Sequence, residues 1–218
     1  MLNNSEGREQ KMELLYDEEL LVFWELCGSD SNNAYLLVCP QSRESIIIDA
    51  PLNPENIIKE AENTNVAAIL ITHGHKDHLE GLGQIVEATG APVAANLGDV
   101  SRIPEATMFL EDGEFITAGT IGLSAIHTPG HTPGSLCYMT GKHLFTGDTL
   151  YAHAPGETQG PENTQQLIYG ITQKLLTLPP DTFILPGHGR GTTVAAARLL
   201  YASWASEFPD VLPPLSPL

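Results

Sequence analysis

Four apolar runs in this sequence each end in a loop that carries histidine or aspartate side chains. The run at residues 66–71 precedes a cluster at residues 73–78, and further runs precede His131, Asp148 and His188. Runs of this length and composition predict buried β-strands. Because α/β folds assemble their sites where strands end, the pattern favours a fold in which these four loops meet.

Strand-like and helix-like segments alternate along the rest of the chain. We expect strands at residues 20–24, 34–38, 45–49, 66–71, 92–95, 106–110, 114–117, 121–127, 135–139, 143–146 and 182–185, and helices at about 54–62, 79–88, 164–176 and 193–207. Asn53 is the expected N-cap of the first helix, and Asn163 or Thr164 that of the third. This order predicts two sheets packed face to face with helices outside, an α/β fold in four layers, αββα.

The composition is that of one globular domain with an acidic surface. The chain has 218 residues, of which 42% are hydrophobic and 17% charged, and its formal net charge is −17. Such a surface repels nucleic acid and anionic membrane, because both need Lys and Arg for neutralisation. We therefore expect a single domain over residues 1–218, with residues 1–11 as a loose arm, 209–218 as a Pro-rich tail, and no nucleic acid or membrane as partner.

The number of cysteines and the composition of the N-terminal residues indicate in which cellular compartment the protein is expected. Three dispersed cysteines are too few for a disulfide framework. The N-terminal residues are polar and carry acids, unlike a secretory signal or a transit peptide, and no apolar run approaches membrane-spanning length. The expected location is the cytoplasm. A homodimer is left open.

The side chains at the four strand ends are ligands that zinc and iron prefer. Together they offer five imidazoles and two carboxylates. In an extended loop, His73 and His75 point the same way and can grip one ion, whereas Asp77 and His78 turn toward a neighbouring position. The set divides into His73, His75 and His131 on one ion, Asp77, His78 and His188 on another, and Asp148 between them. A carboxylate can bridge two cations, which a single imidazole cannot do.

Four motifs give the chain a family resemblance. They are H-x-H-x-D-H at 73–78, T-P-G-H-T-P-G-S at 128–135, F-T-G-D-T at 145–149 and P-G-H-G at 186–189. In these motifs and in their order, the chain resembles the metallo-β-lactamase superfamily, within it the glyoxalase II-like (hydroxyacylglutathione hydrolase-like) branch. That branch hydrolyses glutathione thioesters and also includes iron-dependent persulfide dioxygenases. A bridging Asp148, together with His78, separates the chain from the β-lactamases.

The resemblance and the residues together predict a metal-dependent hydrolase acting on a small-molecule substrate. A hydroxide bound by two divalent ions would attack an acyl carbonyl, expected to be that of a thioester, and Asp77 would steady this nucleophile. Zinc is the first expectation, with iron or manganese as alternatives. Iron-dependent persulfide dioxygenation and lactone hydrolysis remain open, because the same motif serves all three. A metal-structured binding module is disfavoured, because structural zinc sites rarely need seven ligands.

Substrate contacts are expected beyond the ligands themselves. Tyr151 and His153 lie in the loop after Asp148, where members of the branch commonly carry a Gly-x-Gly-Arg segment that this chain lacks. Arg190 follows His188 and is the candidate to hold a substrate carboxylate. His127 is either an orienting partner in the His131 turn or an ordinary strand-end histidine.

Overall fold

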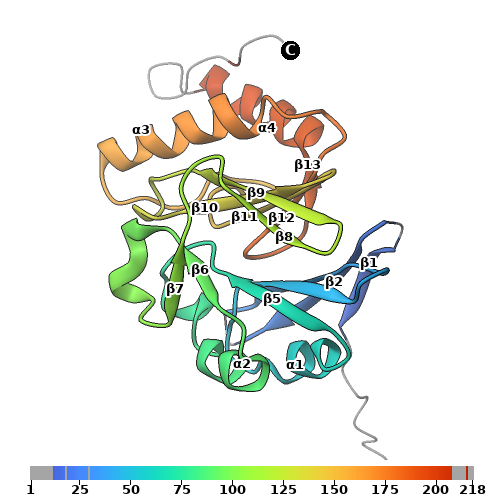
Figure 1. Cartoon of the computed structure of the whole chain (residues 1–218). Coiled ribbons are helices and arrows are strands. Elements are labelled where there is room, and N and C mark those ends of the chain that lie inside the picture. The colour runs from blue at the N-terminus through green and yellow to red at the C-terminus, as the bar shows by residue number, and fades with distance from the viewer. Residues whose placement is uncertain (1–11, 18, 29, 208–214, 216–218) are drawn as a thin grey trace, which may run out of the picture.

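The computed structural model describes residues 12–17, 19–28, 30–207 and 215. Within them two β-sheets pack face to face, and helices cover both outer surfaces (Figure 1). The four-layer sandwich expected from the sequence is confirmed. Both proposed terminal segments, the arm at 1–11 and the tail at 209–218 apart from Leu215, lie outside the described residues.

The first sheet has seven strands in chain order, β1-β2-β3-β4-β5-β6-β7. Their bounds are β1 Glu13–Asp17, β2 Leu21–Cys27, β3 Asn32–Val38, β4 Glu44–Ile48, β5 Asn65–Leu70, β6 Val93–Ala95 and β7 Ala106–Phe109. β1 to β4 form an antiparallel meander, and β4 to β7 run parallel. Every residue of β3 is buried, because this central strand is covered on both faces.

The second sheet has six strands in the order β13-β12-β11-β10-β9-β8. Their bounds are β8 Phe115–Ala118, β9 Ile121–His127, β10 Leu136–Thr140, β11 His143–Gly147, β12 Phe183–Pro186 and β13 Thr192–Thr193. β11 and β12 are parallel neighbours, so both end at the same edge of the sheet. β9 alternates buried and half-buried residues through Ile121, Leu123 and Ala125, as a strand with one inward face does.

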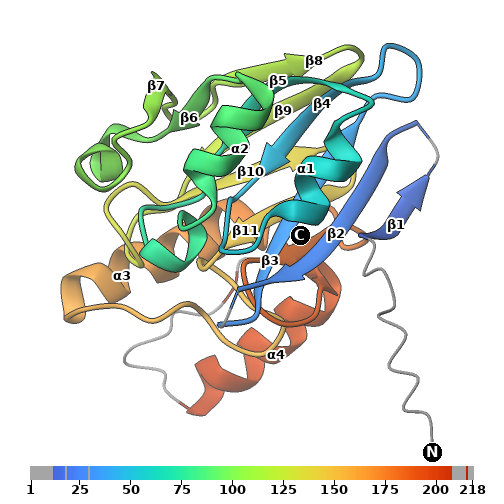
Figure 2. The same ribbon diagram turned by 90° about the horizontal axis from the view of Figure 1, so that it is seen from below.

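The helices lie outside this pair of sheets. α1 Glu55–Ala61 and α2 Leu82–Thr89 cover the first sheet, as the view from below shows (Figure 2). α3 Pro161–Gly170, its π-helical continuation η3 Ile171–Leu175, and α4 Val194–Glu207 cover the second sheet. Two 3₁₀ segments, η1 Lys76–His78 and η2 Leu97–Arg102, lie in loops. In the part of the chain that the structure describes, no helix combines the length and apolar character needed to cross a bilayer.

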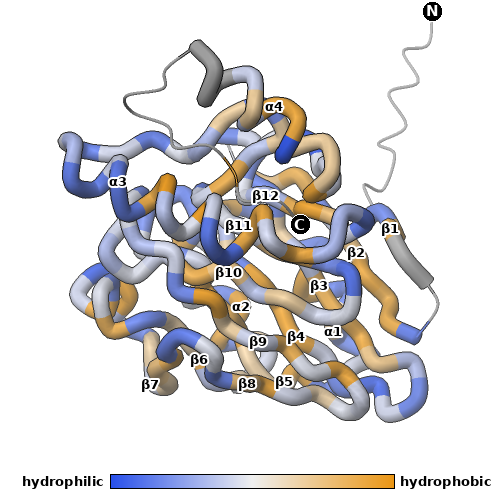
Figure 3. Tube along the Cα trace, turned by 90° about the horizontal axis from the view of Figure 1, so that it is seen from above, coloured by the Kyte–Doolittle hydropathy of each residue, from blue (hydrophilic) through white to orange (hydrophobic). Residues whose placement is uncertain are grey.

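Three apolar clusters correspond to the three interfaces between layers. The cluster between the sheets includes Leu37, Leu70, Tyr138 and Phe145, all nearly inaccessible to solvent. The other two lie between each sheet and its helices. Coloured by hydropathy, the chain is mainly hydrophobic along the strands, whereas connecting loops are mainly hydrophilic (Figure 3). Burial of this apolar surface stabilises the sandwich.

Helix starts differ from expectation. α1 begins at Glu55, and Asn53 has a left-handed backbone (φ 63°) instead of acting as its N-cap. α3 begins at Pro161 after Gly160, so neither Asn163 nor Thr164 is its cap. Proline suits a first helical position because the missing N–H would have no partner in the helix. The edge strands β1 and β13 were not expected, because short edge strands carry a weak apolar pattern.

Candidate metal centre

The loops that follow β5, β9, β11 and β12 meet at one edge of the sandwich. β5 belongs to the first sheet and leads to the loop with His73 and His75, and β9, β11 and β12 belong to the second. The sheets are tied together beside this loop, where Leu136 N donates to Thr72 O (2.8 Å) and the Tyr138 hydroxyl donates to Ile71 O (2.8 Å). The expected convergence of the four loops is confirmed.

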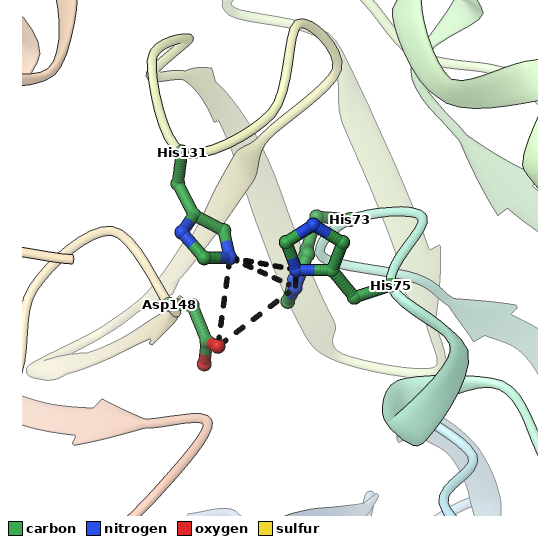
Figure 4. Close-up of side chains that lie close together, drawn as sticks. All are labelled: His73, His75, His131 and Asp148. Carbon is green, nitrogen blue, oxygen red and sulfur yellow. Dashed lines mark hydrogen bonds and ion pairs between the residues drawn. The ribbon is translucent and has the colours of Figure 1, made fainter. Parts of the chain in front are cut away.

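One group consists of His73, His75, His131 and Asp148, whose potential ligand atoms all lie within 4.8 Å of one another. His131 Nε2 is 2.9 Å from His75 Nδ1 and 3.3 Å from His73 Nε2. His73 Nε2 and His75 Nδ1 are 3.1 Å apart. Figure 4 shows the three rings and the carboxylate pointing toward a common centre from three separate loops. We call these four residues the first group.

A second group consists of Asp77, His78 and His188. The Nε2 atoms of His78 and His188 are 3.3 Å apart. Asp77 Oδ2 lies 3.3 Å from His188 Nε2 and 3.7 Å from His78 Nε2. This division of the residues agrees with the one expected from alternation along the 73–78 loop.

Asp148 faces both groups. Its Oδ2 is 3.6 Å from His131 Nε2, 3.9 Å from His73 Nε2 and 3.5 Å from His188 Nε2. Its Oδ1 is 3.5 Å from His78 Nε2 and is buried with no hydrogen-bond partner among the described residues. A buried carboxylate oxygen without a partner is costly, and a bound cation would compensate it.

Hydrogen bonds on the outer side of the rings determine which nitrogen carries the proton. His131 Nδ1 lies 2.8 Å from Glu157 O, His188 Nδ1 lies 3.1 Å from Asp30 O, and His78 Nδ1 lies 2.8 Å from Asp49 Oδ2. Because these oxygens can only accept, each Nδ1 donates, and each neutral ring presents the lone pair of Nε2 to the centre. Ring nitrogens that lie 2.9–3.3 Å from one another and direct their lone pairs to one centre fit a metal ion.

The local electrostatics favour a cation as well. Burial, together with neighbouring imidazoles, holds the pKa of His73 well below its usual value, and burial also lowers the pKa of His75. Burial alone lowers the pKa of His78, but the carboxylates of Asp49 and Asp148 outweigh it and raise that pKa to about 10. The imidazoles of His73 and His75 therefore favour the neutral form, which can bind a cation, and the carboxylates that hold a proton on His78 would stabilise a metal ion in its place.

Glycines let three of these loops approach one another closely. Gly147 has φ 47°, and a Cβ there would lie 2.5 Å from Thr72 Oγ1. A Cβ on Gly187 would lie 2.3 Å from Asp148 Oδ1 and 2.7 Å from His78 Cε1. Neither position has room for a side chain, which explains why glycine precedes Asp148 and His188.

Sequence reasoning missed three buried polar residues that hold the ligands. Asp49, at a left-handed position (φ 61°), accepts from Thr72 N and bonds His78. Asn32 donates from Nδ2 to Asp77 Oδ2 (2.8 Å), and Asp99 accepts from Gly74 N (2.8 Å). Asp49 ends an apolar strand, the signal that identified Asp148, whereas Asn32 and Asp99 lie in turn-like sequence without such a signal.

The expected substrate contacts lie in different places. The ring of Tyr151 is 6.4 Å from the rings of both His153 and His188, so this loop borders the second group. Burial raises the pKa of Tyr151, and Asp148 raises it further, so its hydroxyl stays protonated. Arg190 lines a cavity of about 710 Å³ together with Trp24 and other residues of β2 and β12.

His127, for which two roles were open, lies in the turn that carries His131. Its Nε2 is 2.9 Å from Pro133 O, and its backbone N donates to Asp112 Oδ1 (2.8 Å). The ring thus bonds the backbone of the turn that carries His131.

The sequence profile of the metallo-β-lactamase superfamily matches residues 27–188, about three quarters of the chain. This protein therefore belongs to the metallo-β-lactamase superfamily. Membership and the two His/Asp groups together imply that it binds divalent metal.

Individual relatives differ in their described activities. The chain is 34% identical over 165 residues to the hydroxyacylglutathione hydrolase of Cereibacter sphaeroides (strain ATCC 17025 / ATH 2.4.3), a match covering 74% of this chain and 64% of that protein. It thus spans just under two thirds of that relative's length. The crystal structure of the BLEG-1 B3 metallo-β-lactamase is similar with a TM-score of 0.70 and 30% identity, covering 81% of this chain and 98% of the other. TTHA1623 in a di-iron-bound form gives a TM-score of 0.67 and 28% identity, covering 80% and 96%.

Proposed function

We propose that this protein is a hydrolase that cleaves acyl compounds, thioesters in the first place, with the help of two divalent metal ions. The observation that carries the proposal is the position of Asp148, whose oxygens lie 3.5–3.9 Å from ring nitrogens of both groups. Two-metal hydrolytic sites keep their ions about 3.5–4 Å apart, a span that one carboxylate can bridge.

The ligands of the two ions follow from this geometry. His73, His75 and His131 would hold one ion, Asp77, His78 and His188 the other, and Asp148 would bind both. We expect zinc in both positions, since imidazole and carboxylate suit it. Iron is supported by the similarity to TTHA1623 in its di-iron-bound form, and manganese suits the carboxylates.

Ions bound there would lower the pKa of a shared water toward about 7 and polarise the substrate carbonyl. Asp77 is proposed to orient that water and accept its proton. The 2.8 Å hydrogen bond by which Asn32 fixes Oδ2 of this carboxylate supports the proposal. The water oxygen would then bond to the acyl carbon as the carbon–sulfur bond breaks. The departing thiolate would take the proton from Asp77, so that a carboxylic acid and a thiol are formed. We see no need for a serine or cysteine nucleophile.

The relatives support the thioester as the first substrate class. A hydroxyacylglutathione hydrolase is 34% identical, which makes an acyl-glutathione the first compound to test. Tyr151 and His153 border the second group and are proposed to contact the substrate, and Arg190 to bind a carboxylate that extends into its cavity. Self-association into a homodimer is a separate prediction that sedimentation velocity tests.

Persulfide dioxygenation is the second candidate function, and one observation favours it. The first group alone offers three imidazoles and a carboxylate in one cluster, enough to hold a single iron with positions left for oxygen. Lactone hydrolysis is a third reading with the same acyl chemistry. β-Lactam hydrolysis is disfavoured by Asp148 between the groups, and the BLEG-1 similarity makes a β-lactam a necessary control substrate.

Elemental analysis combined with a substrate panel tests the proposal. The protein as purified, and after reloading with zinc or iron, is assayed with S-acylglutathione, acyl-coenzyme A, a lactone, a β-lactam and glutathione persulfide. Two ions per chain and thioester turnover support the proposal. One iron per chain with oxygen uptake on the persulfide overturns it in favour of the dioxygenase, and inactivity of every loaded form on the panel overturns both.

A further inference from the structure

Asp99 is a buried carboxylate that belongs to neither metal group. It lies in η2, the 3₁₀ segment that follows β6, and only 1% of its surface is accessible. Moving a carboxylate from water into a protein interior costs several kcal/mol unless other groups compensate it. Its bonding partners therefore indicate what the residue does.

Those partners come from both loops that carry the imidazoles of the first group. Asp99 Oδ2 accepts hydrogen bonds from Gly74 N (2.8 Å) and from the Thr132 hydroxyl (2.6 Å). Its Oδ1 accepts from Gly134 N (3.2 Å). Gly74 stands between His73 and His75, and Thr132 follows His131, so one carboxylate joins loops from opposite sheets.

The packing around Asp99 leaves no slack. A Cβ on Gly134 would lie 2.7 Å from Asp99 N and 2.8 Å from its Cγ, and a Cβ on Gly98 would lie 2.8 Å from Gly134 N. Thr132 is itself held by Ser135, whose hydroxyl lies 2.8 Å from that of Thr132 and accepts from Thr132 N (3.0 Å). The hydrogen bonds of Asp99 thus join backbone segments that are already in van der Waals contact, so they fix the position of one segment relative to the other.

In the part of the chain that the structure describes, the cation that accompanies this carboxylate is Arg102. Its Nη1 lies 3.6 Å from Asp99 Oδ1, and its side chain is half exposed. An exposed cation compensates a buried acid weakly, because water screens it. Most of the compensation for burying Asp99 therefore comes from the donors of the two ligand loops.

We propose that Asp99 is a positioning residue that fixes His73 and His75 relative to His131 and so sets the metal affinity of the first group. It touches neither ion nor substrate. The inference rests on the metal centre of the proposed function. Residues that orient metal ligands in this way typically change metal affinity about 10–100-fold when altered.

The experiment measures zinc affinity of the full chain by competition with a chromophoric chelator. Asp99→Asn keeps the shape but replaces one acceptor oxygen with a donor, and Thr132→Val removes the hydroxyl donor. Each is made in the wild-type and in a His188→Ala background, in which binding reports the first group. Asp181→Asn is the matched control, because this exposed carboxylate pairs with Lys142 away from the centre.

We expect Asp99→Asn to weaken the first-group affinity about 10–100-fold, Thr132→Val to weaken it less, and Asp181→Asn to leave it unchanged. The affinity of the second group in the wild-type background is expected to change less than twofold. Thermal unfolding of the metal-free proteins is followed in parallel. If Asp99→Asn does not fold, Thr132→Val decides alone.

Two results would overturn the inference. One is an unchanged first-group affinity in variants that fold, whatever their unfolding temperature. The other is equal weakening of both groups, which indicates general destabilisation instead of positioning. Failure of the proposed function looks different, because it is read from the substrate panel and not from zinc affinity. Failure of the metal centre itself would appear as wild-type protein that binds no zinc at micromolar concentration.

Discussion

The first group is enclosed by three loops, two of which are tied together by the buried carboxylate of Asp99, whereas the second lies beside the β2–β3 hairpin and is partly open. The side chains of His73 and His131 are 1% and 8% exposed, but those of Asp77 and His188 are 28% and 26% exposed. His78 is fully buried and anchors the second group from behind. Enclosure of this kind slows ligand motion and water access, so we expect the first ion to be retained longer and substrate to approach over the second.

The largest expected effect comes from the residue that the two groups share. Asp148→Ala removes the carboxylate between them, so at least one ion is expected to be lost and turnover to fall at least about 100-fold. Elemental analysis and the thioester assay measure both quantities, and circular dichroism checks that the fold is kept. Full activity with two ions bound would contradict the shared role of Asp148.

The substitution Gly187→Ala adds a methyl group and is expected to disturb metal binding by the second group more than by the first. The new Cβ would lie 2.3 Å from Asp148 Oδ1 and 2.7 Å from His78 Cε1, so one of them must move. We expect loss of the second ion and at least about tenfold lower turnover. Gly83→Ala is the control, because nothing lies within 4 Å of that position in α2; it is expected to stabilise the protein by about 0.5–1 kcal/mol. If Gly187→Ala still bound two ions per chain, the centre would tolerate the displacement of Asp148 or His78.

A smaller effect on the second group is expected from a substitution in the β2–β3 hairpin, at Asn32. Asn32→Leu removes the donor to Asp77 Oδ2 while roughly keeping the volume, so affinity for the second ion is expected to fall about 10–100-fold. First-group affinity is expected to stay unchanged. Asn163→Ala, which removes an exposed amide that donates to Gln159 O, serves as the control. A greater loss of metal affinity at the first group than at the second would contradict the assignment of Asn32 to the second group.

The smallest effect is expected at Lys76, which stands between ligands in sequence but not in space. Its side chain is 88% exposed and pairs with Glu80 (2.9 Å), four residues further along the chain. Exposed ion pairs of this kind contribute little. Lys76→Ala is expected to leave metal content, kcat and melting temperature unchanged within error, and a change in kcat above twofold would give this residue a role.

The parts of the centre that sequence could predict share one property, namely position just after an apolar strand. His73, His131, Asp148 and His188 all have it, and the topology brings them together. Asn32 and Asp99 contact residues more than 20 positions away and lie in turn-like sequence, so the local pattern carries no signal for their role. Helix starts were missed for a related reason. Asn is favoured both at an N-cap and at a left-handed position, and which of the two Asn53 adopts depends on its surroundings.

The two sheets contribute unequally to the edge where they meet. The loop after β5 supplies His73, His75, Asp77 and His78 from one sheet, and the remaining ligand positions come from the other. Ions held there would work as cross-links between the layers, so opening the sandwich at this edge would require their release. Loading the protein to about 100 times the dissociation constant would then add about 2.7 kcal/mol to its unfolding free energy. Removal of the ions by a chelator would destabilise the sandwich at this edge. The amide hydrogens at the C-terminal ends of β5 and β11 would then be the first to exchange.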